Sequence, residues 1–176
     1  MTLVRRLPWV VSATETDWDA LYAEYLPRIY NFFRYRVGDG AEAEDLTSLT
    51  FQKAWSARER YRRDLSAFAT WLFTIARHVA IDHLRQRRQQ VPLEAIEHLA
   101  SGDSPEDDAA HRSDMARLTR LLLRLEPDER ELLALKYGAG LTNRAIARST
   151  GLSESNVGTR LHRMVQALRA DWSGDS

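Results

Sequence analysis

Residues 142–168 read TNRAIARSTGLSESNVGTRLHRMVQAL, and this stretch decides the fold class of the chain. Thr142 precedes the first of two helical patterns, as an N-cap residue does. Gly151 separates the patterns and accepts the backbone angles of a tight turn. Ala147 is small enough for two helices to cross closely, and Val157 packs the second helix on the first. This spacing predicts a helix-turn-helix, a motif whose second helix enters the major groove of DNA.

Polar side chains cover the face of the second helix that lies opposite its apolar stripe. Hydroxyl, amide and guanidinium groups of this kind contact base edges and phosphates. The expected DNA-contacting residues of the motif are Thr142, Asn143, Arg144, Ser153, Ser155, Asn156, Thr159, Arg160 and Arg163. The alternative is an ordinary helical hairpin with a solvated polar face.

Helical patterns also precede this motif. Leucines at helical spacing predict a helix that Ser113 or Asp114 caps, and Pro127 suits the first turn of another helix that ends at Gly138. Nearer the N-terminus, apolar stripes predict helices over 18–37, 41–58 and about 66–88. Pro27 should kink or split the first of these three. Strand alternation is not evident in the sequence, so we expect an all-α protein.

Charge divides the chain into parts. The formal net charge is zero, but residues 91–114 contain seven acidic residues and one basic residue. That acidic stretch contains Pro92, Gly102 and Pro105, which is typical of a flexible linker. We therefore expect an extension over 1–15, a helical domain over 16–90, a flexible acidic linker over 91–113 and a helix-turn-helix domain over 114–176.

A basic surplus marks the end of the first domain. From Lys53 to Gln90 there are nine basic residues and three acidic ones. Several of these cations alternate with aromatic residues, a combination that suits a nucleic-acid strand because bases stack while phosphates need neutralising. The alternative is a solvated charged face above a core that contains Phe68 and Trp71.

Together these segments resemble the extracytoplasmic-function, or group four, sigma factors of bacterial RNA polymerase. Residues 43–55 (AEDLTSLTFQKAW) resemble the segment that docks on the clamp of core polymerase, and 71–85 (WLFTIARHVAIDHLR) resemble the helix that meets the minus-ten promoter element. Residues 125–137 resemble the opening of sigma region four, and 140–163 its reader of the minus-thirty-five element. The resemblance covers about residues 18–90 and 114–170.

The resemblance implies roles for individual residues. It implies contact with core polymerase through Asp45, Leu46, Leu49 and Phe51. It implies contact with the minus-ten element through Arg60, Tyr61, Arg62, Arg63, Arg77, His78, Asp82, His83, Arg85, Arg87 and Arg88. The helix-turn-helix set named above then contacts the minus-thirty-five element.

The function implied is promoter-specific initiation of transcription in the cytoplasm, with core RNA polymerase and promoter DNA as partners and an anti-sigma factor as regulator. Two alternatives remain. One is a free-standing helix-turn-helix regulator, which would need a dimerising or sensory domain. The other is a sigma mimic that only sequesters an anti-sigma partner, which has no need of Arg85 or Arg160.

The residues argue against an enzyme, a metal site and membrane insertion. The chain has no cysteine, which excludes disulfides and cysteine-bound zinc and fits a reducing compartment. Its five histidines contain no pair at the i, i+4 spacing of a helical metal site, and it has no glycine-rich phosphate loop. No apolar run approaches the roughly 20 residues that a membrane span needs, and the N-terminus does not read as a signal peptide. We expect no cofactor.

Overall fold

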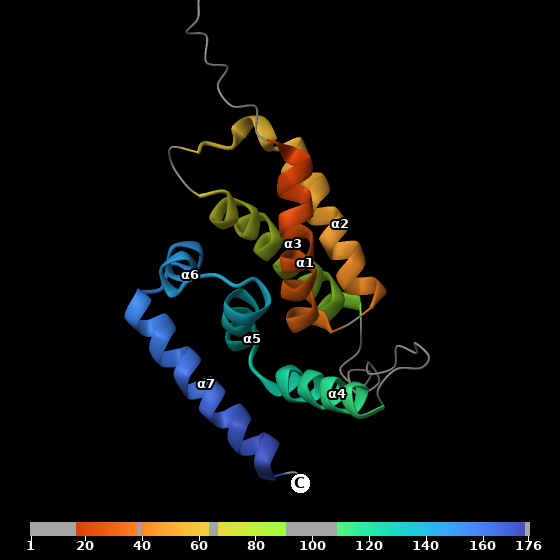
Figure 1. Ribbon diagram of the computed structural model, residues 1–176, viewed down its shortest axis with the longest axis vertical. Helices are drawn as coiled ribbons and strands as arrows, with labels where there is room; N and C mark the ends of the chain where they lie inside the picture. The colour runs from red at the N-terminus through yellow and green to blue at the C-terminus, as the bar shows by residue number, and fades with distance from the viewer. Residues whose placement is uncertain (1–16, 39, 64–66, 91–108, 175–176) are drawn as a thin grey trace, which may run out of the picture.

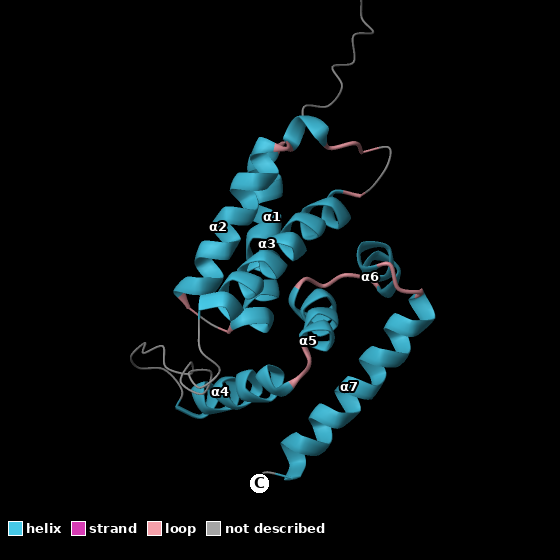
Figure 2. Cartoon of the chain, turned by 180° about the vertical axis from the view of Figure 1, so that it is seen from behind, coloured by secondary structure: helices cyan, strands magenta, loops and turns pink. Residues whose placement is uncertain are grey.

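The computed structural model describes residues 17–38, 40–63, 67–90 and 109–174. Within these ranges every regular element is helical, which confirms the all-α prediction (Figures 1 and 2). The elements are α1 (Trp18–Val37), α2 (Ala41–Ser56), the 3₁₀ turn η1 (Arg58–Arg60), α3 (Phe68–Gln90), α4 (Ala109–Arg124), α5 (Pro127–Leu133), the π-helical segment η3 (Ala134–Gly138), α6 (Asn143–Thr150) and α7 (Glu154–Gly174). The expected extension 1–15 and most of the expected linker lie outside the described residues.

Helix α1 runs without a break through its proline. Its N-cap is Asp17, whose side chain accepts a hydrogen bond from the Ala20 backbone N–H at 3.0 Å. Pro27 was expected to kink or split the helix; it does not split it, since Pro27 lies inside the continuous α1. Both Pro27 and Ala23 are exposed, so water can reach the Ala23 carbonyl, which lacks its usual helical donor.

The N-terminal unit, residues 17–90, packs α1, α2 and α3 around an aromatic core. Phe32, Phe33 and Phe73 are fully buried there. Two buried threonines of α2 do not leave their hydroxyls unpaired: Thr47 donates to the Ala43 carbonyl and Thr50 to the Leu46 carbonyl, at 2.7 and 2.8 Å. Helix α2 ends at Ser56, two residues before the expected end, because the chain tightens into η1.

The C-terminal unit, residues 109–174, contains α4 to α7. Helix α4 begins at Ala109 and not at Ser113 or Asp114 as expected; alanine is the strongest helix former, and Ala109 and Ala110 extend the helix toward the N-terminus. The sequence predicts that the last helix ends at about Ala170, but α7 continues to Gly174. There Arg117 of α4 places its guanidinium 4.4 Å from the centre of the Trp172 ring.

The two units pack against each other. Helix α1 lies along η3, and residues of both units form one hydrophobic cluster. The backbones approach closely at Gly138, where a Cβ atom would lie 2.9 Å from the Asn31 backbone oxygen and 3.0 Å from the Phe32 Cα. Figure 1 shows α6 beside α3, while the C-terminal end of α7 points away from the N-terminal unit.

Candidate nucleic-acid interface

The helix-turn-helix forms as its local signals predict. The Thr142 hydroxyl accepts from the Ala145 backbone N–H at 3.2 Å, and Ser153 caps α7 in the same way toward Asn156 at 3.1 Å. Gly151 has a φ of +76°, in the left-handed region that favours glycine. Val157 is fully buried and packs α7 on α6. The turn between the two helices is therefore fixed by caps, glycine and core together.

Most of the residues expected at the minus-thirty-five element lie on open surface. Ser153, Ser155, Asn156, Thr159 and Arg163 are exposed on or next to α7, and Arg160 is half-buried. Thr142 and Arg144 are also exposed and Asn143 is half-buried, and all three make contacts within the chain. Thr142 is a cap, Asn143 accepts from the Lys136 Nζ at 2.9 Å, and Arg144 lies 3.5 Å from Glu154.

Helix α3 divides the expected minus-ten residues between two faces. His78, Arg85 and Arg88 are exposed, and Arg85 reaches half-buried Asp82 at 3.4 Å. These positions recur every three or four residues and so share one side of the helix. Ile81, which was not among the expected contacts, is 43% exposed on the same side. This side of α3 is open to solvent.

Two residues of the opposite face are held by an acidic partner on α2. His83 Nε2 lies 2.5 Å from a carboxylate oxygen of Glu42, and Arg87 donates to both oxygens of the same carboxylate at 3.2 and 3.3 Å. Glu42 lies in the first turn of α2, where a helix N-terminus favours negative charge. His83 and Arg87 therefore join α2 to α3, and the charge of Arg87 is partly matched inside the unit.

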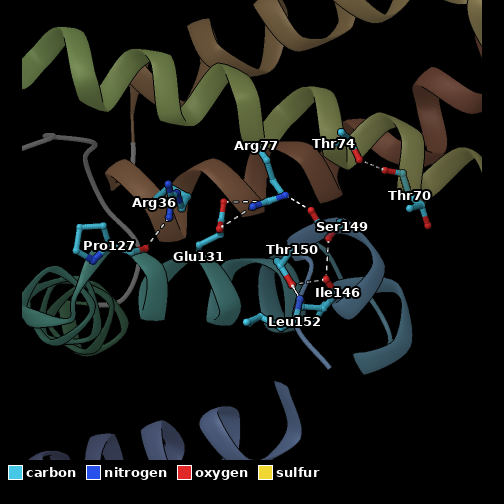
Figure 3. Close-up of polar contacts among 10 residues, drawn as sticks. All are labelled: Arg36, Thr70, Thr74, Arg77, Pro127, Glu131, Ile146, Ser149, Thr150 and Leu152. Atoms are coloured by element: carbon cyan, nitrogen blue, oxygen red, sulfur yellow. Dashed lines mark hydrogen bonds and ion pairs between the residues drawn. The ribbon is translucent and has the colours of Figure 1, made fainter. Parts of the chain in front are cut away.

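Arg77 contacts the C-terminal unit (Figure 3). It forms a two-pronged ion pair with Glu131 of α5, with Nε to Oε1 at 3.0 Å and Nη2 to Oε2 at 3.2 Å, and Nη1 donates to the Ser149 carbonyl of α6. The side chains are 15% and 10% exposed. Arg36 lies nearby and donates to the Pro127 carbonyl at 2.7 Å. Burial lowers the pKa of the Arg36 guanidinium, and the charge of Glu131 opposes this shift.

The arginines around residues 59–63 surround an aromatic cluster. Arg60, Arg62 and Arg63 are exposed. Tyr61 is half-buried, with its ring centre 5.0 Å from Trp71 and 5.5 Å from Phe68. The aromatic rings thus anchor this segment on α3 and leave its cations toward solvent.

The residues expected to contact core polymerase are not equally accessible. Asp45 is exposed, Leu49 is 39% exposed, and Phe51 is half-buried. Leu46 is only 4% exposed and belongs to the core of the N-terminal unit. Its side chain is therefore not available to a partner.

Sequence reasoning did not include two aromatic residues in this set. Tyr22 is 49% exposed with its ring centre 4.6 Å from that of Phe51, and Trp55 is 52% exposed beneath the Arg58 guanidinium. Trp55 belongs to the segment 43–55 that resembles the polymerase-docking segment. Because tryptophan is enriched among the residues that dominate protein interfaces, its presence there was the signal that could have identified it.

A further apolar groove lies beside α4 and α7. Its volume is about 240 Å³. Leu118, Leu121, Val165 and Leu168 line it from the C-terminal unit, and Tyr35 of α1 completes it. Tyr137, also in its lining, is 52% exposed.

The described residues contain no group of three or more His, Cys, Asp or Glu side chains placed to hold a metal ion. None of the helices in the described ranges is both long and apolar enough to cross a membrane.

Comparison with known families accounts for both units. Residues 21–90 match Sigma-70 region 2, and residues 115–168 match Sigma-70 region 4. RNA polymerase sigma factor CarQ of Myxococcus xanthus is 34% identical over 149 residues, which cover 85% of each chain. The chain belongs to the ECF sigma factors of RNA polymerase. The ECF sigma factor BldN of Streptomyces coelicolor is also 34% identical, over 96% of this chain, which spans 64% of BldN.

Solved structures share the arrangement of helices. The structure of CnrH in complex with the cytosolic domain of CnrY has a TM-score of 0.69 and 25% identity, and the match covers 90% of this sigma factor and 89% of CnrH. Sigma factor RpoE in complex with the anti-sigma factor NepR, from Bartonella quintana, has a TM-score of 0.73 at 22% identity, covering 92% of this chain and 100% of RpoE. The second match bears on the fold alone.

Proposed function

We propose that this sigma factor recognises promoters through two separate surfaces and acts by binding, not by catalysis. The observation that carries this proposal is the presence, in one chain, of a capped helix-turn-helix with an open polar face and a second helix, α3, whose accessible side is basic. The exposed residues of α7 contact the minus-thirty-five duplex. His78, Arg85 and Arg88, together with the arginines at 60–63, contact the minus-ten element.

Each surface supplies a different kind of contact. Guanidinium groups such as Arg88 neutralise phosphates and supply affinity, whereas Asn156 and Arg163 reach base edges and supply specificity. Two weak modules joined in one chain raise each other's effective concentration on a promoter. The division near residues 90 and 114 into two such modules is part of the proposal.

Core polymerase is proposed to bind the outer face of α2. Asp45 and Leu49 are exposed on α2, and Tyr22 of α1 pairs with Phe51 of α2. Exposed aromatic and apolar side chains beside a charged one are typical of protein interfaces. Trp55 extends it. We place this activity in the cytoplasm, which agrees with a chain that has no cysteine.

The test is run-off transcription from a fragmented genomic library, using core polymerase with and without the protein. Discrete transcripts that require the protein are expected. Asp45→Arg should abolish them by loss of core binding, and Arg163→Glu by loss of promoter binding with core binding kept. Asp171→Arg, which reverses another exposed acid near the end of α7, is the matched control and should leave transcription unchanged.

The same experiment separates the alternatives. Binding to core without any new transcript would favour a sigma mimic over an initiation factor. A stable dimer that binds palindromic DNA and ignores core polymerase would favour a free-standing regulator.

An anti-sigma protein is the proposed regulator. The apolar groove beside α4 and α7 exposes Tyr137 and is a suitable site for an amphipathic helix. In the solved structures, CnrH is in complex with the cytosolic domain of CnrY, and RpoE of Bartonella quintana is in complex with the anti-sigma factor NepR. Proteins retained by the immobilised sigma factor should include one that, once purified, abolishes run-off transcription. Tyr137→Glu should restore transcription in its presence, whereas Tyr137→Phe should not.

A further inference from the structure

The second helix of the helix-turn-helix, α7, has a glycine at the edge of its open face. Gly158 is half-buried and its φ is not positive, so the backbone at this position does not require glycine. Glycine inside a helix is also less stable than alanine. Ser155 and His162, three residues before Gly158 and four residues after it, lie on the same side of α7 and are exposed. The missing side chain therefore leaves space beside the surface proposed to contact the minus-thirty-five duplex.

A side chain of α6 borders this space. A Cβ atom at position 158 would lie 3.5 Å from the Asn143 Nδ2. The other end of the same amide is held, because the Asn143 Oδ1 accepts a hydrogen bond from the Lys136 Nζ at 2.9 Å. The ammonium group of lysine can only donate, so the amide oxygen faces Lys136 and the amide NH₂ group faces Gly158. Lys136 thus decides which end of the amide lies beside the glycine.

Lys136 is itself placed by a constrained segment. It belongs to the π-helical segment η3, and π-helical turns often lie at functional sites. The loop between η3 and α6 is tied back, since the Leu141 backbone N–H donates to the Leu135 carbonyl at 3.0 Å. Gly140 turns this loop with a φ of +68°. Lys136 and Asn143 are therefore held together before any DNA is bound.

The surroundings of the Asn143 amide favour an anion. Its NH₂ group has no hydrogen-bond partner among the described residues. Asn143 is the first residue of α6, where the helix dipole is positive, and Lys136 adds a full positive charge. The first helix of a helix-turn-helix crosses the DNA backbone, and asparagine is among the side chains that contact phosphate. A phosphate oxygen is therefore the acceptor that best matches this donor.

We propose that Asn143 donates from Nδ2 to one backbone phosphate of the minus-thirty-five duplex, that Lys136 positions this amide, and that Gly158 lets the DNA strand approach it. The contact fixes the register of α7 in the major groove, so that its base-contacting residues meet the correct base pairs. This inference rests on the proposed function and adds Lys136 and Gly158, which were not among the expected contacts.

The experiment uses holoenzyme, formed from core polymerase and the full-length protein, on a promoter identified by run-off transcription. Copies of the promoter have a methylphosphonate, which is neutral, in place of one phosphate at a time across the minus-thirty-five element. At the phosphate that Asn143 contacts, wild-type holoenzyme should lose affinity roughly tenfold, as expected for one charge-assisted hydrogen bond.

Asn143→Asp is the decisive variant because it keeps the size and shape of the side chain. One carboxylate oxygen can still accept from Lys136, but the group that faces Gly158 becomes a negatively charged acceptor. Aspartate suits the first turn of a helix, so urea unfolding should show no loss of stability. Affinity for the unmodified promoter should fall roughly tenfold or more. The methylphosphonate at the same phosphate should then cause no further loss, because the two changes remove one interaction.

Gln166→Glu is the matched control. It makes the same change from amide to carboxylate at an exposed residue of α7, about 12 Å further along the helix than Gly158. Its holoenzyme should keep both the wild-type affinity and the full methylphosphonate effect.

Lys136 and Gly158 are tested by two further readouts. Lys136→Met removes the donor and should abolish the methylphosphonate effect at that phosphate, whereas Lys136→Arg keeps a cationic donor and should retain it. Gly158→Ala should stabilise α7 and yet weaken promoter binding roughly threefold, because its Cβ covers one side of the amide and removes part of one hydrogen bond. A glycine with a merely structural role would not show a gain in stability together with a loss of affinity.

Two results would overturn the inference. One is an Asn143→Asp holoenzyme that loses affinity by the same factor on the unmodified promoter and on every methylphosphonate copy; a loss that is coupled to a base-pair substitution instead would place the amide on a base edge. The other is a Gly158→Ala holoenzyme that binds as tightly as wild type. Both results leave transcription by the wild-type holoenzyme intact, whereas failure of the proposed function removes it.

Discussion

At the scale of single residues, the neighbours of each arginine decide what it can do. Lys53 and Lys136 are the only lysines of the chain, so arginine supplies nearly all of its positive charge. Arg85 and Arg88 lie on the open side of α3, while Arg77 and Arg87 face Glu131 and Glu42. The sequence predicts which arginines share a helix face, but the partner that covers a face is distant in sequence and was not predictable.

The neighbouring arginines 87 and 88 should therefore behave differently. Arg88→Ala removes an exposed cation, and we expect weaker promoter binding by the holoenzyme, with the slope of log affinity against log salt reduced by about 1. The free energy of unfolding should not change. Titration of promoter binding over a range of salt concentrations measures the slope.

Arg87→Ala is the matched variant. The substitution removes the ion pair between Arg87 and Glu42 of α2. Because this ion pair is partly exposed, it contributes only about 0.5–1 kcal/mol of stability. We expect urea unfolding to show a small decrease in the free energy of unfolding. The slope of log promoter affinity against log salt should not change. Equal salt slopes for the two variants would contradict the assignment of α3 faces.

At the scale of elements, the helix-turn-helix was predictable because its determinants are local. Thr142 and Ser153 cap their own helices, Gly151 turns the chain between them, and Val157 is buried, all within one short stretch. No distant partner is needed to specify this geometry. The predicted cap at Thr142 and the predicted turn at Gly151 therefore agree with the structure.

Gly151→Ala should destabilise the C-terminal unit. Alanine at a φ of +76° brings its Cβ close to the following carbonyl, at a cost of about 1–2 kcal/mol. We expect a lower midpoint of urea unfolding and weaker binding to the minus-thirty-five duplex. Gly151→Asn should lose less stability than Gly151→Ala, since asparagine tolerates this conformation better than alanine.

Gly158→Ala should have the opposite effect on stability. Gly158 lies within α7, and a Cβ there would be 3.5 Å from the Asn143 Nδ2, an ordinary contact. Replacing glycine inside a helix stabilises it by about 0.5–1 kcal/mol. Urea unfolding followed by circular dichroism should show the gain, and a loss of stability would show that position 158 needs glycine for a reason other than space.

Elements whose boundaries depend on tertiary surroundings were predicted less well. Pro27 is tolerated within α1 because its side of the helix faces water, and α7 extends to Gly174 where Trp172 packs under Arg117. The π-helical turns at 134–138 also carry no local signal. This segment packs closely on α1, and no pattern within the segment predicts that contact.

At the scale of the whole molecule, the two predicted domains share one hydrophobic cluster. Ile29, Phe32 and Leu135 all belong to it and are fully buried. The apolar stripe over residues 18–37 predicts a helix with one buried face. A helix stripe shows that a surface is buried without showing which unit buries it, so the docking of the two units could not be predicted.

A shared core has a consequence for unfolding. Because α1 packs against η3, neither unit can unfold without exposing apolar surface of the other. Heat should therefore unfold the free chain in one cooperative transition. Scanning calorimetry tests this through the ratio of calorimetric to van't Hoff enthalpy, which should be near one. Gly138→Ala forces the units apart at the Asn31 backbone, so its transition should broaden or divide and the ratio should rise above one. Two separate transitions in the wild-type chain would instead mean that the units are energetically independent, and that the contact of Arg77 with Glu131 does not couple them.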